Sequence, residues 1–94
     1  MTGLFDQRTI IPKDVMVRDV AGETVLLNLN TGTYFGLNEV GTRMWYSLEQ
    51  AGSVQEAFDT LISEYDVDPD TLLKDLRKLI EDLVGHGLLV YAET

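Results

Sequence analysis

Cysteine is absent from the 94 residues, and histidine occurs once, as His86. Without cysteine the chain can form neither a disulfide bond nor a thiolate metal site, and it has no thiol nucleophile. A single histidine cannot build a zinc site without several carboxylates. We therefore expect no metal ion and no cofactor. The absence of cysteine also fits a reducing compartment, and we expect a cytoplasmic location.

Basic residues are scarce as well, because seven Lys and Arg stand against sixteen Asp and Glu, for a formal net charge of −9. Nucleic-acid binding draws most of its affinity from basic side chains on phosphates, so this balance argues against a nucleic-acid partner. It argues equally against binding to anionic membrane surfaces. The N-terminal residues lack the basic start and apolar run of a signal peptide. No apolar stretch approaches the ~20 residues of a transmembrane helix.

The residues that catalysis requires are missing too. A catalytic site needs a nucleophile with a base, a metal cluster, or paired carboxylates in a cleft. The spacing of Gly32, Gly36 and Gly41 is too wide for a phosphate-binding loop, and no lysine follows at the right place. His86 lies between two glycines where a helix is expected to end, so we interpret it as a capping or surface residue. We therefore expect a binding module and not an enzyme.

The first half of the chain has the period of β-strands. Residues 15–19 are short and β-prone, 23–29 alternate, and 33–37 form a third β-prone run. Asn30-Thr31-Gly32 predicts a hairpin turn, because glycine supplies the positive φ of tight turns. Leu26 falls among the polar positions of its strand, so both faces of that strand are expected to be partly covered. The pattern predicts a three-stranded antiparallel meander in a domain spanning 15–94, preceded by a flexible N-terminal arm, 1–14.

From Asn38 onward the apolar residues follow the period of helices. Asn38 is a good N-cap, Ser53 and Glu56 form a capping box, and Asp68 with Pro69 begins a third helix. We expect helices over about 38–50, from 54, and over 69–84, and a short final strand over 88–91. The predicted fold is α+β: a winged helix-turn-helix with an N-terminal three-stranded antiparallel sheet, then three helices and a short C-terminal strand.

An acidic turn precedes the third helix. Asp66, Asp68 and Asp70 alternate as in a calcium loop. However, Pro69 interrupts them, and the glycine and the distal glutamate of an EF-hand are both absent. We interpret this turn as a helix cap.

The third helix carries a wide apolar surface that spans about 140° at ~100° per residue. It consists of Leu72, Leu73, Leu76, Leu79, Ile80, Leu83 and Val84. Deep docking in a small domain would account for this width, but one margin could instead line a groove. The meander has two free edges, and an extended peptide could pair with an edge beside such a groove. Tyr34 and Phe35 are adjacent on the third strand and must point to opposite faces.

Three segments resemble a known family in the same order and at matching spacing. The first, 34–45, resembles a signature of a strand, Leu-Asn, x-x-Gly and x-x-(Ile/Met)-Trp. The second is Ser53-Val54-Gln55-Glu56-Ala57, and the third comprises Asp75-Leu76, Leu79-Ile80, Leu83 and Gly87-Leu88-Leu89. Over 15–91 the chain is similar to the PqqD-like family, the recognition elements that bind precursors of ribosomally made, modified peptides.

The resemblance implies a function and a site. Members of the family bind the leader segment of a precursor peptide as an added antiparallel strand against the third helix. The implied pairing strand is Thr33, Tyr34, Phe35, Gly36 and Leu37, and the implied helix wall is Leu72, Asp75, Leu76 and Leu79. We expect Asp75 to accept a hydrogen bond from the leader. The alternative for Asp75 is a contact with Lys78, three residues on.

The pathway and the partners are expectations of the same kind. The strand sequence is more similar to the free-standing leader-binding proteins of lasso-peptide biosynthesis, which implies a leader peptidase and a macrocyclase as partners. The alternative is the free-standing protein of pyrroloquinoline quinone biosynthesis, a peptide chaperone for a radical SAM enzyme. A DNA-binding winged-helix regulator is disfavoured by acidic residues around Lys74, Arg77 and Lys78. A purely structural subunit is a further alternative, and we expect a monomer or a weak homodimer.

Overall fold

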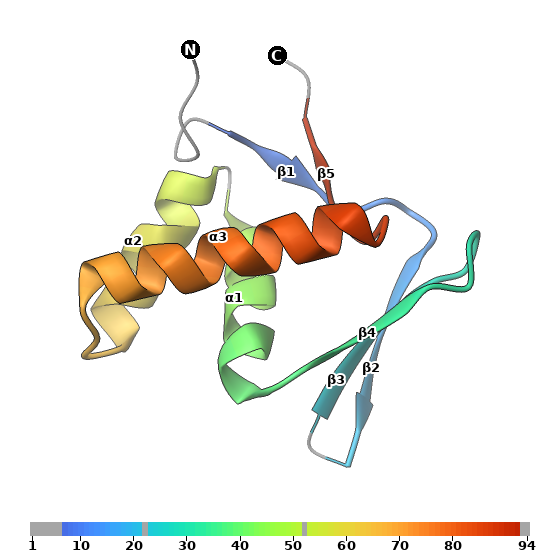
Figure 1. The fold of residues 1–94 in the computed structure, drawn as a ribbon, viewed down its shortest axis with the longest axis horizontal. Helices are drawn as coiled ribbons and strands as arrows, with labels where there is room; N and C mark the ends of the chain where they lie inside the picture. Colours follow the sequence, from blue (N-terminus) through green and yellow to red (C-terminus); the bar gives the residue numbers. More distant parts are fainter. Residues whose placement is uncertain (1–6, 22, 52, 93–94) are drawn as a thin grey trace.

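Strands and helices follow one another in the predicted α+β order (Figure 1). The computed structural model describes residues 7–21, 23–51 and 53–92. The strands are β1 (Thr9–Ile10), β2 (Val15–Val20), β3 (Glu23–Asn28), β4 (Tyr34–Leu37) and β5 (Val90–Tyr91), and the helices are α1 (Glu39–Gln50), α2 (Val54–Glu64) and α3 (Pro69–Gly85). Strand β1 is the element that the sequence pattern did not predict.

The predicted meander is present as an antiparallel sheet in the order β2-β3-β4. Gly32 has φ +76° in the turn between β3 and β4, which is the backbone conformation that glycine adopts without strain. The backbone N–H of Asn28 donates to the carbonyl of Thr33 at 2.8 Å and closes this hairpin. Because β3 is central, β2 and β4 are both edge strands.

The buried face of β3 is the one that carries its polar residues. Thr24, Leu26 and Asn28 are buried, whereas Leu27 is half-exposed and Leu29 is exposed. The amide nitrogen of Asn28 donates to the carbonyl of Gly87 at 2.7 Å, so this buried side chain has a partner. Burial of a polar group is tolerated when it is hydrogen-bonded in this way. The outward face of β3 is therefore the more apolar of the two.

Strand β1 lies within the expected N-terminal arm, 1–14, and pairs it with the last strand of the chain. Thr9 pairs with Tyr91 and Ile10 with Val90, so β1 and β5 form a separate two-stranded antiparallel sheet. The carbonyl of Gln7 also accepts a hydrogen bond from the backbone N–H of Val54 at 3.0 Å. Backbone hydrogen bonds of this kind do not require a repeating pattern of apolar side chains. The sequence pattern therefore did not predict them. Residues 1–6 of the arm lie outside the described residues.

All three helices begin at the predicted caps. The side chains of Asn38, Ser53 and Asp68 each accept a hydrogen bond from the backbone N–H three residues on, at 2.8, 3.2 and 3.1 Å. These bonds satisfy N–H groups that have no partner within the first turn of a helix. Helix α3 continues one residue beyond the predicted end, and His86 is its C-cap, as interpreted from the sequence.

The core lies where the three helices and the inner face of the meander meet. Trp45 is its largest fully buried side chain. The other buried apolar residues are Leu26, Leu37, Met44, Leu48, Val54, Ala57, Leu61, Leu72, Leu76, Ile80, Leu83, Leu88 and Leu89. At the surface, Arg43 of α1 pairs with Glu64 at the end of α2. The hydrogen bond to Glu64 raises the pKa of the Arg43 guanidinium further above its already high value.

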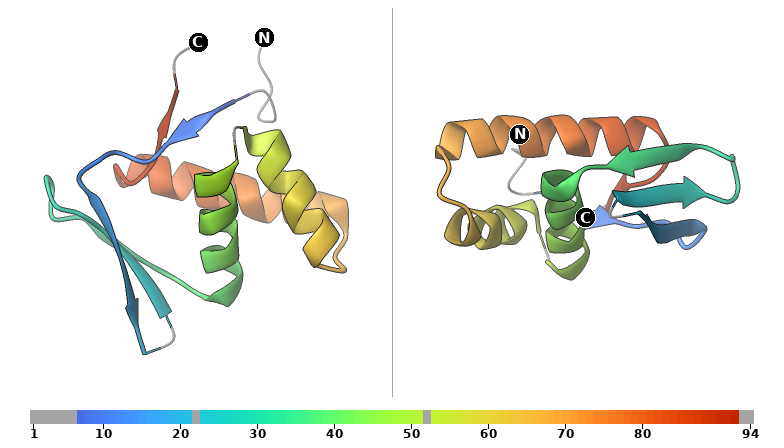
Figure 2. Two further views of the ribbon diagram at one scale, coloured as in Figure 1. Left: turned by 180° about the vertical axis from the view of Figure 1, so that it is seen from behind. Right: turned by 90° about the horizontal axis from the view of Figure 1, so that it is seen from below.

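Helix α3 runs across the other two helices and lies beside the meander (Figure 1). Seen from below, β4 is the strand nearest to α3, with β3 and β2 farther away (Figure 2). The β4 edge of the meander therefore faces α3, the helix for which the sequence predicted a wide apolar surface. Within the described residues, the helices are all too short or too polar to cross a membrane.

Candidate functional site

Strand β4 offers unpaired backbone groups along its outer edge. In an antiparallel ladder, pairs that exchange hydrogen bonds alternate with pairs that do not. The bond between Asn28 and Thr33 sets this alternation, and Phe35 and Leu37 follow as the residues bonded to β3. The N–H and C=O groups of Tyr34 and Gly36 consequently point away from β3. These groups are available to another extended chain.

A cavity of about 420 Å³ lies between the start of α1 and the middle of α3, next to the end of β4. Leu79 provides apolar surface on the α3 side, and Val40 provides it on the α1 side. The lining residues are Asn38, Val40, Gly41, Met44, Asp75, Lys78, Leu79 and Asp82. The cavity is open and of mixed polarity, so an extended peptide leaving β4 could lie in it.

A second cavity, of about 160 Å³, adjoins the first and is more enclosed and more apolar. It shares Val40, Met44 and Asp75 with the first cavity. Its remaining lining residues are Leu61, Tyr65, Val67, Thr71 and Leu72. Small apolar pockets with a polar group at the opening suit a single anchoring side chain.

Asp75 stands at the junction of these two cavities without an ion-pair partner among the described residues. Lys78 bonds to the Asp82 carboxylate at 3.2 Å, one turn further along α3. Lys78 therefore pairs with Asp82 and not with Asp75, which was the alternative considered from the sequence. The exposed Asp75 carboxylate can accept hydrogen bonds from a ligand in either cavity.

At the other end of β4, Phe35 packs against the cap of α3. Its ring meets the His86 ring edge-on, with centroids 5.1 Å apart. The Nδ1 of His86 lies 2.6 Å from the carbonyl oxygen of Asp82, so Nδ1 is the protonated donor nitrogen. Tyr34 points to the opposite face and is 71% exposed. The two aromatic residues therefore face opposite ways, as their adjacency predicts.

The structure separates the predicted helix wall into two groups. Asp75 and Leu79 line the larger cavity. Leu76 is fully buried, and Leu72 is 4% exposed and reaches only the smaller cavity. Leu76 faces the core because it lies on the middle of the apolar surface of α3, so it cannot contact a ligand directly. The four positions implied by the resemblance are thus divided between the core and the cavities, and their contact with a leader stays a prediction.

Sequence reasoning missed the contribution of α1 to this region. Val40 was not among the predicted site residues, yet its side chain is 46% exposed and lines both cavities. Its position two residues after the Asn38 cap, in the first turn of a helix, was the available signal. Among the described residues, no three His, Asp or Glu side chains gather in a way that could hold a metal ion.

Comparisons with known proteins place this geometry in a family. The family model of coenzyme PQQ synthesis protein D (PqqD) matches residues 23–89. A solved structure of TbiB1 in complex with the TbiA(beta) leader peptide is 42% identical, with a TM-score of 0.77. A structure of lasso peptide synthetase B1 complexed with the leader peptide is 23% identical and has the same fold, with a TM-score of 0.77.

Each of these two structures is matched over 88% of this chain and 98% of its own. No curated protein sequence matches this chain. The family model covers more than half of the chain, and the 42% identical structure is matched over nearly all of it. The chain therefore belongs to the PqqD family.

Proposed function

We propose that this protein is a non-catalytic adaptor that binds the leader segment of a ribosomal precursor peptide. The leader adds to the meander as an antiparallel strand on β4 and packs against α3. The observation that carries this proposal is the open edge of β4 beside the two cavities between α1 and α3. An extended peptide is the ligand that uses both features at once.

The backbone groups of Tyr34 and Gly36 supply the hydrogen bonds, and the cavities supply side-chain specificity. Alternate side chains of a strand point to the same face, so every second leader residue would lie on the side of α3. We propose Thr33, Tyr34, Phe35, Gly36 and Leu37 as the pairing strand. Leu79 and Asp75 would contact the leader, with Asp75 accepting a hydrogen bond from it. Leu72 and Leu76 would support this surface from the core.

A partner enzyme requires a second surface, and the outer face of the meander supplies one. Met16, Leu27 and Tyr34 lie directly opposite one another across the three strands, and Met16 and Tyr34 are exposed. A leader strand on β4 would extend this apolar row by one more strand. We propose that the partner, a leader peptidase acting with a macrocyclase, docks on the row and so receives the leader.

We propose lasso-peptide biosynthesis as the pathway. The 42% identical relative, TbiB1, was solved with a leader peptide bound, which supports leader recognition by this chain. The family takes its name from PQQ synthesis, so a peptide chaperone for a radical SAM enzyme is the second candidate. We also propose the winged helix-turn-helix arrangement, in which the β1–β5 pair serves as the wing.

The test is fluorescence anisotropy with the labelled leader of the precursor encoded beside the gene. Gly36→Pro removes the outward N–H and should abolish binding, whereas Gly36→Ala keeps it and should bind as the parent does. Proline is tolerated on edge strands, and a Cβ at Gly36 meets nothing within 4 Å. Asp75→Asn, which keeps the shape of the side chain, should weaken binding by ~1.5–3 kcal/mol if the carboxylate accepts a leader hydrogen bond.

Circular dichroism would establish that Gly36→Pro remains folded. Equal binding by the proline and alanine variants would rule out strand addition on β4. A parent protein that binds no leader, even with the partner enzyme present, would remove the adaptor function altogether.

A further inference from the structure

One buried side chain joins the hairpin between β3 and β4 to the end of α3. Asn28 is 6% exposed, and its amide nitrogen donates to the carbonyl of Gly87 at 2.7 Å. Its amide oxygen accepts hydrogen bonds from the backbone N–H groups of Asn30 and Thr31, at 2.8 and 3.2 Å. This side chain therefore holds both the turn that precedes β4 and the segment that follows α3.

Gly87 is itself fixed relative to α3. The backbone N–H groups of Gly87 and Leu88 donate to the carbonyls of Val84 and Leu83, at 3.1 and 2.9 Å. This is the Schellman arrangement that ends many helices, and Gly87 has the positive φ, +71°, that the arrangement favours. The bond from Asn28 consequently attaches the meander to a point that is rigidly connected to α3.

Phe35 and His86 form a second contact between β4 and the end of α3. Their rings meet edge-on, with centroids 5.1 Å apart. We name the Asn28–Gly87 hydrogen bond and the Phe35–His86 contact together the hairpin clamp. The clamp lies at one end of the space between β4 and α3, and the cavity beside the end of β4 lies at the other.

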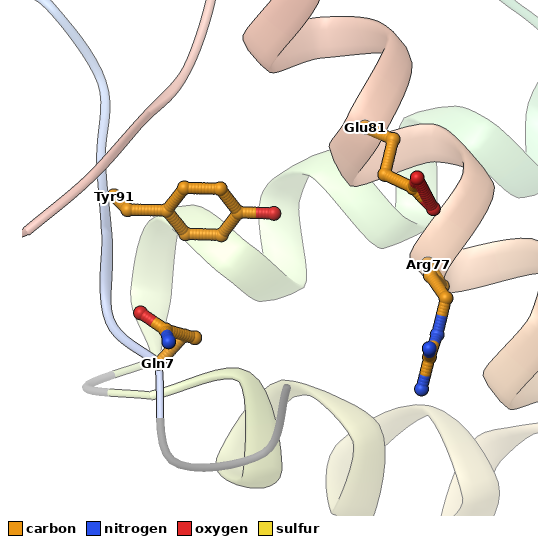
Figure 3. Close-up of a pocket in the computed structure, with 4 residues that line it drawn as sticks. All are labelled: Gln7, Arg77, Glu81 and Tyr91. Atoms are coloured by element: carbon orange, nitrogen blue, oxygen red, sulfur yellow. The ribbon is translucent and has the colours of Figure 1, made fainter. Parts of the chain in front are cut away.

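The side of α3 that faces β5 is built differently. Gln7, Arg77, Glu81 and Tyr91 surround an open depression of about 430 Å³ there. Tyr91 extends from β5 toward α3, where Arg77 and Glu81 project from successive turns (Figure 3). Within the described residues, the side chains of Gln7 and Tyr91 form no hydrogen bond to α3. The hydrogen bond that connects a sheet to the end of α3 through a side chain is therefore on the side of β4.

A leader strand on β4 would have to satisfy two distances at once. Its backbone must lie one strand spacing, roughly 4.8 Å, from β4. Its inward side chains must also reach Asp75 and Leu79 on α3. The separation between β4 and α3 therefore decides whether both sets of contacts form together. A separation that is fixed before binding avoids the cost of ordering it during binding.

We propose that the hairpin clamp sets this separation, with Asn28 and His86 as positioning residues for leader binding. This inference rests on the proposed function and extends it to residues that act through their neighbours. Asn28 is buried on the inner face of β3, so it acts through the turn and Gly87 and not by touching the leader. His86 acts through the ring of Phe35.

The experiment measures anisotropy of the labelled leader with three single substitutions in the whole chain. Asn28→Asp keeps an oxygen for the turn but replaces the donor to Gly87 with a second oxygen. Asn30→Asp makes the same chemical change on an exposed turn residue. Thr24→Val removes a hydrogen bond of a buried hydroxyl, to Asp19 at 3.1 Å, at the other end of β3. We expect Asn28→Asp to bind the leader roughly tenfold more weakly and both controls to bind as the parent does.

A second labelled leader separates positioning from a general loss of stability. Its paired segment carries alanine at the alternate residues that face α3, which are the set whose replacement has no further effect on binding to the Leu79→Ala variant. This alanine leader gains little from α3, so Asn28→Asp should cost it little affinity. An equal loss for both leaders would overturn the proposal, because it would show damage to β4 itself. The same loss with Thr24→Val or Asn30→Asp would overturn it as an effect of stability or charge.

His86→Ala carries the test if circular dichroism shows that Asn28→Asp does not fold. The His86 side chain is exposed at the C-cap of α3, and its removal deletes the contact with Phe35 while the Asn28–Gly87 bond remains. We expect roughly threefold weaker binding of the whole leader and little change for the alanine leader. Parent-like binding of the whole leader by a folded His86→Ala protein would then overturn the proposal.

Failure of the clamp differs from failure of the adaptor function. If the parent protein binds neither leader, leader recognition and the role of the clamp fall together. If the parent binds the whole leader and a folded Asn28→Asp protein binds it equally well, only the role of the clamp falls.

Discussion

Leu76 and Leu79 are three residues apart on α3 but have different surroundings. Leu76 is fully buried against the core, and Leu79 is half-buried at the cavity beside β4. From the sequence they are indistinguishable, because both lie within one wide apolar surface. Which of them can meet a ligand depends on where β4 and α1 end, and that is a property of tertiary packing.

Alanine substitution should separate their roles. Leu79→Ala should weaken leader binding by about 1–3 kcal/mol, as expected for an interface anchor, with a small loss of stability. Leu76→Ala should lower the free energy of unfolding by ~2–5 kcal/mol because it leaves a cavity in the core. Urea unfolding and leader titration of each variant check both effects. A folded Leu79→Ala protein with unchanged affinity would exclude Leu79 from the contact surface.

At the scale of the elements, helix caps were predicted more accurately from single capping residues than strands were from the period of their apolar residues. The helix caps were predicted to the residue because each depends on a short-range hydrogen bond that a particular side chain accepts from the backbone, as at Asn38 or Asp68. The faces of β3 were harder to assign, because Asn28 is buried through a bond to Gly87, 59 residues away. Strand β1 escaped prediction because two residues have no period. The buried face of β3 and the presence of β1 both depend on partners that are distant in the sequence, so the sequence pattern alone did not predict them.

The cap of α3 gives a prediction at this scale, since α3 forms one wall of the proposed site. Asp68 accepts a hydrogen bond from the backbone N–H of Thr71 at 3.1 Å. Asp68→Ala should lower the free energy of unfolding by about 1 kcal/mol. Asp66→Ala removes the same charge two residues earlier, outside the helix, and should have a smaller effect. Thermal unfolding compares the two, and equal losses would show that general charge and not capping is responsible.

At the scale of the whole molecule, the two surfaces of the proposed site are made by segments distant in the sequence. The outer row of the meander and the cavities between α1 and α3 both end at β4. The resemblance of the sequence to the family predicted β4 and α3 as the site. It did not reveal the contribution of α1, because Val40 lies beside α3 only in the folded chain.

A strand added to β4 should stabilise the entire domain, because β4 is joined through β3 and α1 to the core. A ligand that binds only the folded state at 100 times its Kd adds about 2.7 kcal/mol to the free energy of unfolding. For a domain of this size each kcal/mol raises Tm by roughly 4–8 °C. We therefore expect the leader to raise Tm by roughly 10–20 °C by calorimetry. A scrambled leader and the Gly36→Pro variant serve as controls, and both should show no shift. An equal shift with the scrambled peptide would mean that the leader binds without register, which is incompatible with pairing to β4.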